Sequence, residues 1–216
     1  MKKIILLSAT FFSITVYAQT TIRLGVEAGP NMTLSYAGTN ASETKSSPAY
    51  AFWGGALLEA SLKQPDDIFK LQFGILYNQQ HQKFSSAGTD YSMRFQQISM
   101  PLTGKIYFSP RASFNFGPVF NFAVGAKEKT TSPNSHFEST IEKGYLTTVQ
   151  GGATFGLSYY CRNGLFITGS YNQMSGYALQ NDNQSGVPFR PRLNYARIGI
   201  GFLFHSFSPD VPGSGS

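Results

Sequence analysis

A few side chains in this sequence have the types and spacing that nucleophilic chemistry needs. Ser135, His136, Glu138 and Ser139 are clustered in one polar segment, and a serine near a histidine is a pair that lipid-directed hydrolases and acyltransferases use. Such clusters arise readily by chance in polar segments, so we interpret this one as a solvated loop without fixed geometry. The sequence therefore favours a protein without enzymatic activity.

The remaining histidines and the cysteine do not form a metal-binding pattern. His81 has no second histidine or acid at ligand spacing, and His205 with Ser206 directly follows the last predicted strand. Cys161 is the only cysteine, which excludes a disulfide within the chain and a cysteine-based metal site. We expect neither a metal nor a cofactor.

Residues 1–18 have the organisation of a secretory signal peptide. Lys2 and Lys3 precede a largely apolar run from Ile4 to Ala18, which ends in small residues that signal peptidase accepts. The run is shorter than the roughly 20 residues that a helix needs to span a bilayer. We predict cleavage after Ala18 and export of the remaining chain, in which residues 19–205 form one domain.

Alternation of apolar and polar residues with period 2 dominates the rest of the chain and predicts strands with two different faces. In residues 114–126, phenylalanines at every second position alternate with asparagines and glycines. Eight segments show this pattern: 21–36, 52–62, 68–80, 97–108, 114–126, 148–161, 164–172 and 195–204.

The connections between these segments are of two kinds. Three are short turns, at residues 63–67, 108–111 and 161–164. Four are longer and polar, at residues 37–48, 85–90, 127–143 and 179–192. Outer-membrane barrels have short periplasmic turns and long external loops. We therefore predict an all-β fold, an eight-stranded antiparallel up-and-down transmembrane β-barrel with its long loops outside the cell.

Alternation alone does not distinguish a membrane barrel from a soluble lipocalin-like carrier, in which the apolar face would be the core. Charged residues make up only 13% of the chain and aromatic residues 15%, which is little charge for a water-exposed surface. The polar faces are rich in glycine, serine, threonine and asparagine, as suits a narrow lumen, and tyrosines lie towards strand ends, as in aromatic girdles. These features favour location in a bacterial outer membrane.

Six charged residues fall on the polar faces of the predicted strands, so we expect a polar network inside the barrel. Charges in a confined interior are tolerated only when they are paired. Closure makes the first and last strands neighbours, which predicts that Glu27 and Arg197 lie at similar depth, and Glu59 and Lys70 lie on adjoining strands. The network is predicted to comprise Arg23, Glu27, Glu59, Lys70, Lys105 and Arg197.

Several segments together resemble the PorT-like outer-membrane β-barrel family of Bacteroidetes. They include "LGVEAGPNMT", "FKLQFGILYNQQ", "QISMPLTGKIYF", "FNFGPVFNFAVGAK", "GLFITGSYN" and "RIGIGFLF", and the resemblance covers the chain up to Phe204. It implies an eight-stranded barrel. PorT itself serves a protein secretion system, whereas most members have no assigned activity. The end of the chain, "SFSPDVPGSGS", departs from a bare barrel, and we interpret residues 206–216 as a flexible tail typical of a cloning scar.

Three functional classes remain open: a structural or interaction barrel, a small transport pore, and a lipid-modifying enzyme. The first is favoured because side chains can fill the lumen of an eight-stranded barrel. We expect contact with outer-membrane lipid and with a protein partner, for example in a secretion or uptake complex. The formal net charge is +6, but lysines and arginines are scattered and form no basic stripe, so we expect no nucleic-acid partner.

Overall fold

The computed structural model of the chain describes residues 21–36, 45–61, 68–86, 89–132, 135–141, 146–179 and 192–204. The predicted signal peptide, its cleavage site, the turn at residues 63–67 and the tail at residues 206–216 lie outside the described residues.

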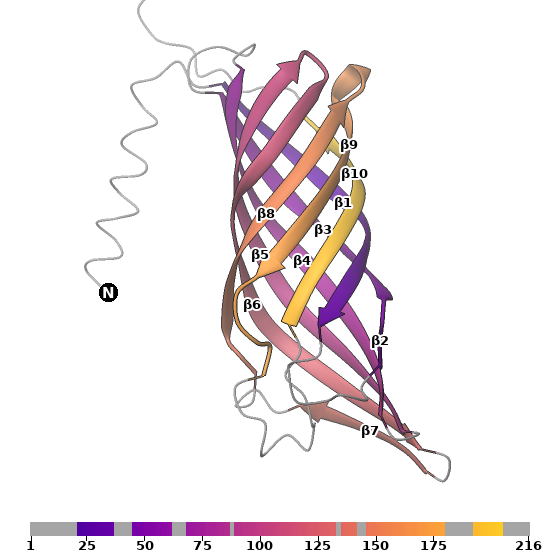
Figure 1. The fold of residues 1–216 in the computed structure, drawn as a ribbon. Coiled ribbons are helices and arrows are strands. Elements are labelled where there is room, and N and C mark those ends of the chain that lie inside the picture. The colour runs from indigo at the N-terminus through magenta and orange to yellow at the C-terminus, as the bar shows by residue number, and fades with distance from the viewer. Residues whose placement is uncertain are drawn as a thin grey trace, which may run out of the picture.

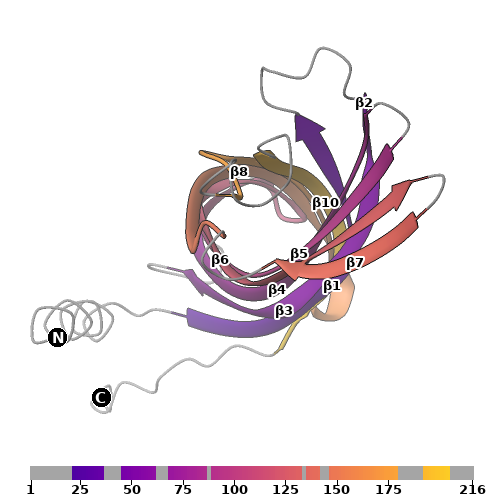
Figure 2. The same cartoon turned by 90° about the horizontal axis from the view of Figure 1, so that it is seen from below.

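Of the ten strands described, eight pair with their neighbours in chain order and close into a ring (Figures 1 and 2). Every pairing is antiparallel, and the last strand pairs with the first, which confirms the predicted up-and-down barrel. No helix in these residues is long and apolar enough to cross a membrane. The ring consists of β1 (Thr21–Tyr36), β3 (Ala49–Ser61), β4 (Phe69–Ser86), β5 (Thr89–Ser109), β6 (Ala112–Ser132), β8 (Val149–Tyr160), β9 (Leu165–Met174) and β10 (Arg192–Leu203).

The barrel has a turn end, where β1 begins and β10 ends, and an opposite loop end. At the turn end, β5 and β6 are separated by two residues, and β8 and β9 by Cys161 and the short 3-10 turn η2 (Arg162–Gly164). This turn places Asn163 at φ 65° and Gly164 at φ 84°, in the left-handed region that asparagine and glycine tolerate best. The two predicted short turns within the described residues are thereby confirmed.

Side chains alternate between the outer and inner faces of the ring as the sequence predicts. Phe120 on β6 is 45% exposed, whereas the adjacent Asn121 is completely buried inside. In the described parts of the other seven segments the outward side chains are likewise mostly apolar and most inward ones are small or polar, but a few large apolar side chains, such as Trp53, Leu57 and Phe166, also point inward. The outer apolar surface that results encircles the barrel and is called the apolar belt below.

Strands continue beyond the belt at the loop end, where the sequence predicted loops. Residues 85–90 lie mostly in the β4–β5 hairpin, and residues 127–143 lie mostly in β6 and the added strand β7 (Ser135–Ile141). A further short strand, β2 (Lys45–Ser47), pairs with β4. Figure 1 shows these strands flaring away from the ring. We call this extension the outer sheet; its order is β2, β4, β5, β6, β7.

The loop prediction was wrong for residues 85–90 and 127–143, because the alternation that indicated the barrel strands changes where β4, β5 and β6 leave the apolar belt. Residues 37–44 and 180–191, in the other two predicted loops, lie outside the described residues. On β4 the outward side chains change from apolar Ile75 to charged Lys83, while the inward position 84 is a buried phenylalanine. On β5, Met93 points inward and is buried, and Arg94 points outward and is exposed. This inverted alternation is that of a sheet whose outer face meets water, and it marks the edge of the apolar belt.

Three prolines interrupt the hydrogen-bonded ladders of the ring. Pairing is broken at Pro30 between β1 and β10, at Pro101 between β4 and β5, and at Pro118 between β5 and β6. Proline has no backbone N–H to donate and is therefore rare inside sheets. The break at Pro30 matters most, because it lies at the seam that closes the barrel.

Candidate functional site: the barrel lumen

A buried charged cluster centred on Glu59 occupies the lumen near the turn end. Arg23 Nη2 donates to Glu59 Oε1 at 2.6 Å, and Lys105 Nζ donates to Glu59 Oε2 at 2.9 Å. The hydroxyls of Tyr107 and Tyr160 each donate to the same Oε2 at 3.3 Å. Glu59 is 1% exposed, so its charge is balanced by these donors rather than by water.

Aromatic rings hold the lysines of this cluster. Lys105 Nζ donates to the Tyr160 hydroxyl at 2.5 Å and lies 5.7 Å from the centre of the Phe166 ring. Lys70 Nζ lies 4.6 Å from the centre of the Tyr107 ring, which links it to the Glu59 cluster. Cation–π contacts of this kind gain strength when the ammonium group is desolvated. Four of the six predicted network residues, Arg23, Glu59, Lys70 and Lys105, are thus brought together.

The two other predicted residues, Glu27 and Arg197, do not face each other. Glu27 on β1 lies opposite Gly201, and Arg197 on β10 lies opposite Asn31. Glu27 is buried, and its Oε1 accepts no hydrogen bond from any described residue. The prediction that these two residues lie at similar depth came from counting residues from the strand ends. Such a count ignores the stagger with which strands close a barrel, so it gave the wrong register.

Arg197 instead contacts Trp53 and Ser170. Its Nε donates to Ser170 Oγ at 2.7 Å, and its guanidinium lies 4.6 Å from the Trp53 ring centre. Trp53, which is 1% exposed, reaches across the seam between β1 and β10: its Nε1 lies 3.2 Å from the Pro30 carbonyl oxygen and 3.3 Å from that of Ile198. The indole N–H therefore donates at a point of the seam where Pro30 has no backbone N–H to donate.

The seam accepts this indole because Gly199 leaves room for it. A Cβ at position 199 would lie 2.5 Å from Trp53 Cζ2, which is closer than real contacts allow. The seam between β1 and β10 therefore depends on the side chains of Trp53, Pro30 and Gly199 as well as on backbone pairing.

Replacing Trp53 by phenylalanine is expected to lower the free energy of unfolding by about 1–3 kcal/mol, because two partly buried backbone carbonyls lose their shared donor. Urea unfolding in lipid vesicles, followed by the gel mobility of folded and unfolded barrel, measures this loss. Tyr195→Phe is the matched control, since that buried hydroxyl has no partner among the described residues. Equal losses in both variants would show that the indole hydrogen bonds do not stabilise the seam.

Amide and hydroxyl side chains fill the middle of the lumen. Asn31 Nδ2 donates to Asn78 Oδ1 at 2.6 Å, and Gln97 Nε2 donates to Gln150 Oε1 at 3.3 Å. Closer to the turn end, Asn115 Nδ2 donates to Ser158 Oγ at 2.7 Å. These contacts join strands that are adjacent or one strand apart in the ring. The interior side chains around them, such as Asn78, Asn121 and Asn172, are at most 1% exposed, so the lumen is packed rather than open.

An apolar cluster closes the lumen at the loop end, which the sequence analysis missed. It contains residues of the strands and of the loop-end connections: Phe84, Met93, Phe95, Ala126, Ile141, Leu146, Ala178, Leu179 and Leu193. The inverted alternation around Met93 and Phe95 could have revealed the strand part of this cluster. The contributions of Leu146 and Leu179, which form an isolated bridge, have no periodic signal in the sequence.

The candidate catalytic residues do not form a site in the described part of the chain. Glu138 and Ser139 lie on β7, so the predicted loop is a strand there, while the side chains of Ser135 and His136 and residues 205–206 lie outside the description. His81 Nε2 lies 2.8 Å from Ser92 Oγ. No group of three potential metal ligands occurs among the described residues.

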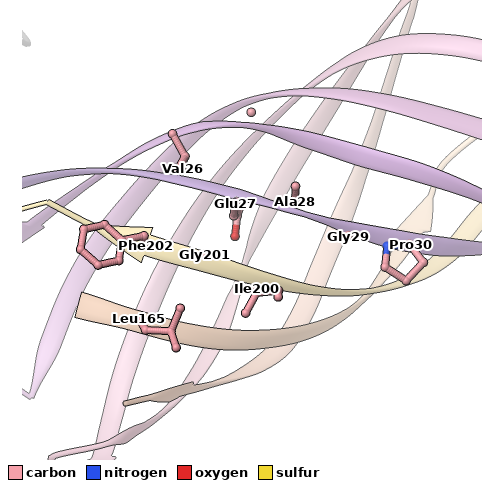
Figure 3. Close-up of a pocket in the computed structure, with 10 residues that line it drawn as sticks. Val26, Glu27, Ala28, Gly29, Pro30, Leu165, Ile200, Gly201 and Phe202 are labelled. Atoms are coloured by element: carbon pink, nitrogen blue, oxygen red, sulfur yellow. The ribbon is translucent and has the colours of Figure 1, made fainter. Parts of the chain in front are cut away.

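An apolar groove of about 860 Å³ lies on the outside of the β1–β10 seam (Figure 3). Outward side chains of three neighbouring strands line it, including Val26, Leu165, Ile200 and Phe202, all of which are well exposed. Since the groove is part of the apolar belt, its chemistry suits lipid acyl chains.

A closed antiparallel barrel with an apolar outer belt and a polar, packed interior is a transmembrane β-barrel of the outer-membrane type. The model of the family described as "Outer membrane protein beta-barrel domain" matches residues 17–175, and the chain belongs to this family. Membership implies location in a bacterial outer membrane. The match does not distinguish PorT-like members, so that finer resemblance stays a prediction.

Solved structures of several bacterial barrels are similar to this chain. Ail of Yersinia pestis is 12% identical, covers 85% of this chain and 98% of its own, with a TM-score of 0.43. Neisserial surface protein A is 12% identical, with coverage of 85% and 97% and a TM-score of 0.45. A major outer membrane protein of Thermus thermophilus is 13% identical, with coverage of 85% and 99% and a TM-score of 0.46. Comparison with curated proteins finds no match.

Proposed function

We propose that this protein is a non-catalytic, non-conducting outer-membrane barrel that binds a partner through its outer sheet. The observation that carries the proposal is the continuation of β4, β5 and β6 well beyond the apolar belt, with β7 added at the edge. A barrel that served only to fill the membrane would not need strands that extend into water. By the short-turn rule for these barrels, we assign the turn end to the periplasm and the outer sheet to the cell exterior.

The outer sheet presents an apolar row that is suited to contact a protein. Phe84, Tyr91, Thr130 and Phe137 are directly opposite one another on four successive strands. Phe84 is buried in the apolar cluster, whereas Phe137 at the other end of the row is 65% exposed. An exposed aromatic side chain on a rigid, partly buried row is a typical anchor for a partner. An accessory role in a secretion complex, as the PorT-like resemblance implies, or in an uptake complex is compatible with such a contact.

Site-specific photocrosslinking in intact cells tests this proposal. A photoreactive residue at Phe137 is expected to give a protein adduct of defined mass, whereas one at Asn163, exposed at the turn end, is expected to give none. Adducts at Asn163 alone would place the partner on the periplasmic side. Only lipid adducts at Phe137 would also contradict the proposal.

The alternative of a transport pore is tested by conductance of the purified protein in planar bilayers. Because the Glu59 cluster closes one end of the lumen and the apolar cluster the other, we expect no sustained channel. A stable, long-lived conductance of the wild type would replace the interaction role with a pore.

A further inference from the structure

Two rows of basic side chains cross the outward face of the outer sheet, directly beyond the apolar belt. Cross-strand pairing sets the order within each row. The first row is His81 on β4, Arg94 on β5 and Lys127 on β6, and the second is Lys83, Ser92, Lys129 and Glu138 on β4 to β7. Except for His81 and Ser92, which are half-buried, all of these side chains are exposed.

Among the described residues, the two rows carry more positive than negative charge. Arg94 and Lys127 lie directly opposite each other, an arrangement of like charges that destabilises a sheet. Glu138 is the single acid within the two rows. Asp90 lies in the next row outward, where it accepts a hydrogen bond from Ser85. Such a surface gains stability when an external anion lies between its cations.

The pKa of His81 is affected by the positive charges of the two rows. Burial, with the positive charges of Arg94 and Lys83, lowers the pKa of His81, against a raising contribution from a hydrogen bond with the Tyr50 backbone. The lowered pKa favours the neutral form of the imidazole. A phosphate placed beside Arg94 would oppose the field of the cations and raise this pKa.

The position of the basic rows relative to the apolar belt indicates which anion they bind. On β4 the outward residues run from Ile75 and Tyr77 in the belt to His81, and on β6 they run from Val124 to Lys127. The basic rows therefore begin within a few residues of the acyl region, which is the level of lipid headgroups. Positive charge that continues a lipid-facing surface is complementary to the phosphates of those headgroups.

We propose that the two basic rows bind phosphate groups of lipid headgroups in the external leaflet. The assignment of the leaflet rests on the orientation given under Proposed function. The binding chemistry is separate from the protein contact at Phe137, which lies on the other face of the outer sheet.

The test uses the folded full-length protein in neutral detergent, titrated with a bisphosphorylated lipid A and with the same lipid after dephosphorylation. We expect the phosphorylated lipid to bind at least tenfold more tightly. Neutralising a basic group near an anionic surface costs about fivefold in affinity, so Arg94→Gln with Lys127→Gln should weaken binding about 25-fold. Arg111→Gln, an exposed position at the turn end, is the matched control and should bind as the wild type does. Imidazole NMR should show the pKa of His81 rising only with phosphorylated lipid.

Equal binding of the two lipids would overturn the proposal. So would an equal loss in the Arg111→Gln control, or displacement of the lipid by millimolar inorganic phosphate, which would indicate a site for a free anion. Because this titration depends on neither orientation nor a protein partner, it can fail while the crosslinking experiment succeeds, and the reverse.

Discussion

Replacing Glu59 by glutamine is expected to lower the free energy of unfolding of the barrel by about 3–5 kcal/mol, the cost of leaving a buried charge without its partner. Lys105 is 2% exposed and would lose its carboxylate partner without gaining access to water. Arg23 is 29% exposed, so water can replace part of what it loses. Urea unfolding in lipid vesicles measures the change, and fluorescence of Trp53, the single tryptophan of the chain, reports it.

Second-site variants show whether the lost stability comes from stranded charge. In the Glu59→Gln background, Lys105→Met should recover more than half of the loss, because it removes the buried cation. Arg23→Met in the same background should recover little, since Arg23 already reaches water. If Lys105→Met makes the single variant still less stable, the carboxylate stabilises the barrel through packing and not through its charge.

Which residues form the outer face of the barrel was predictable because side chains that contact lipid must be apolar. Every outward position inside the membrane must be apolar, while the lumen accepts small and polar residues, so alternation such as that around Phe120 survives without any specific contact. The same rule placed Arg23, Glu59, Lys70 and Lys105 on the inner face. Predicting the fold needed only this contrast and the lengths of the connections.

Contacts across the ring were not predictable in the same way. The stagger between β1 and β10 decides whether Glu27 meets Arg197 or Gly201, and nothing local in either strand encodes it. The bond from Trp53 to Ile198 joins residues 145 positions apart, and it exists because Pro30 removes a donor between them. The outer sheet was missed for a different reason, since its strands face water outside and an apolar cluster inside.

Replacing Phe120 by arginine is expected to impair the barrel by about 2–4 kcal/mol, the cost of a cationic side chain near the bilayer midplane. Phe120 lies in the middle of the outward row that runs from Phe114 to Val124, so an arginine there is far from both headgroup regions. Folding into lipid vesicles, read by the gel mobility of folded and unfolded protein, measures the change.

Phe137→Arg is the matched control, because it is the same substitution on a strand of the same sheet beyond the apolar belt. Phe137 is 65% exposed, and an arginine at that position can remain in water, so we expect folding close to that of the wild type. A large loss of folding in Phe120→Arg with little loss in Phe137→Arg would show that Phe120 faces lipid, since a soluble barrel would tolerate arginine at both exposed positions. Equal tolerance of the two substitutions would mean that the outer face at β6 does not meet acyl chains, and the membrane edge inferred from the inverted alternation on β4 and β5 would be wrong with it.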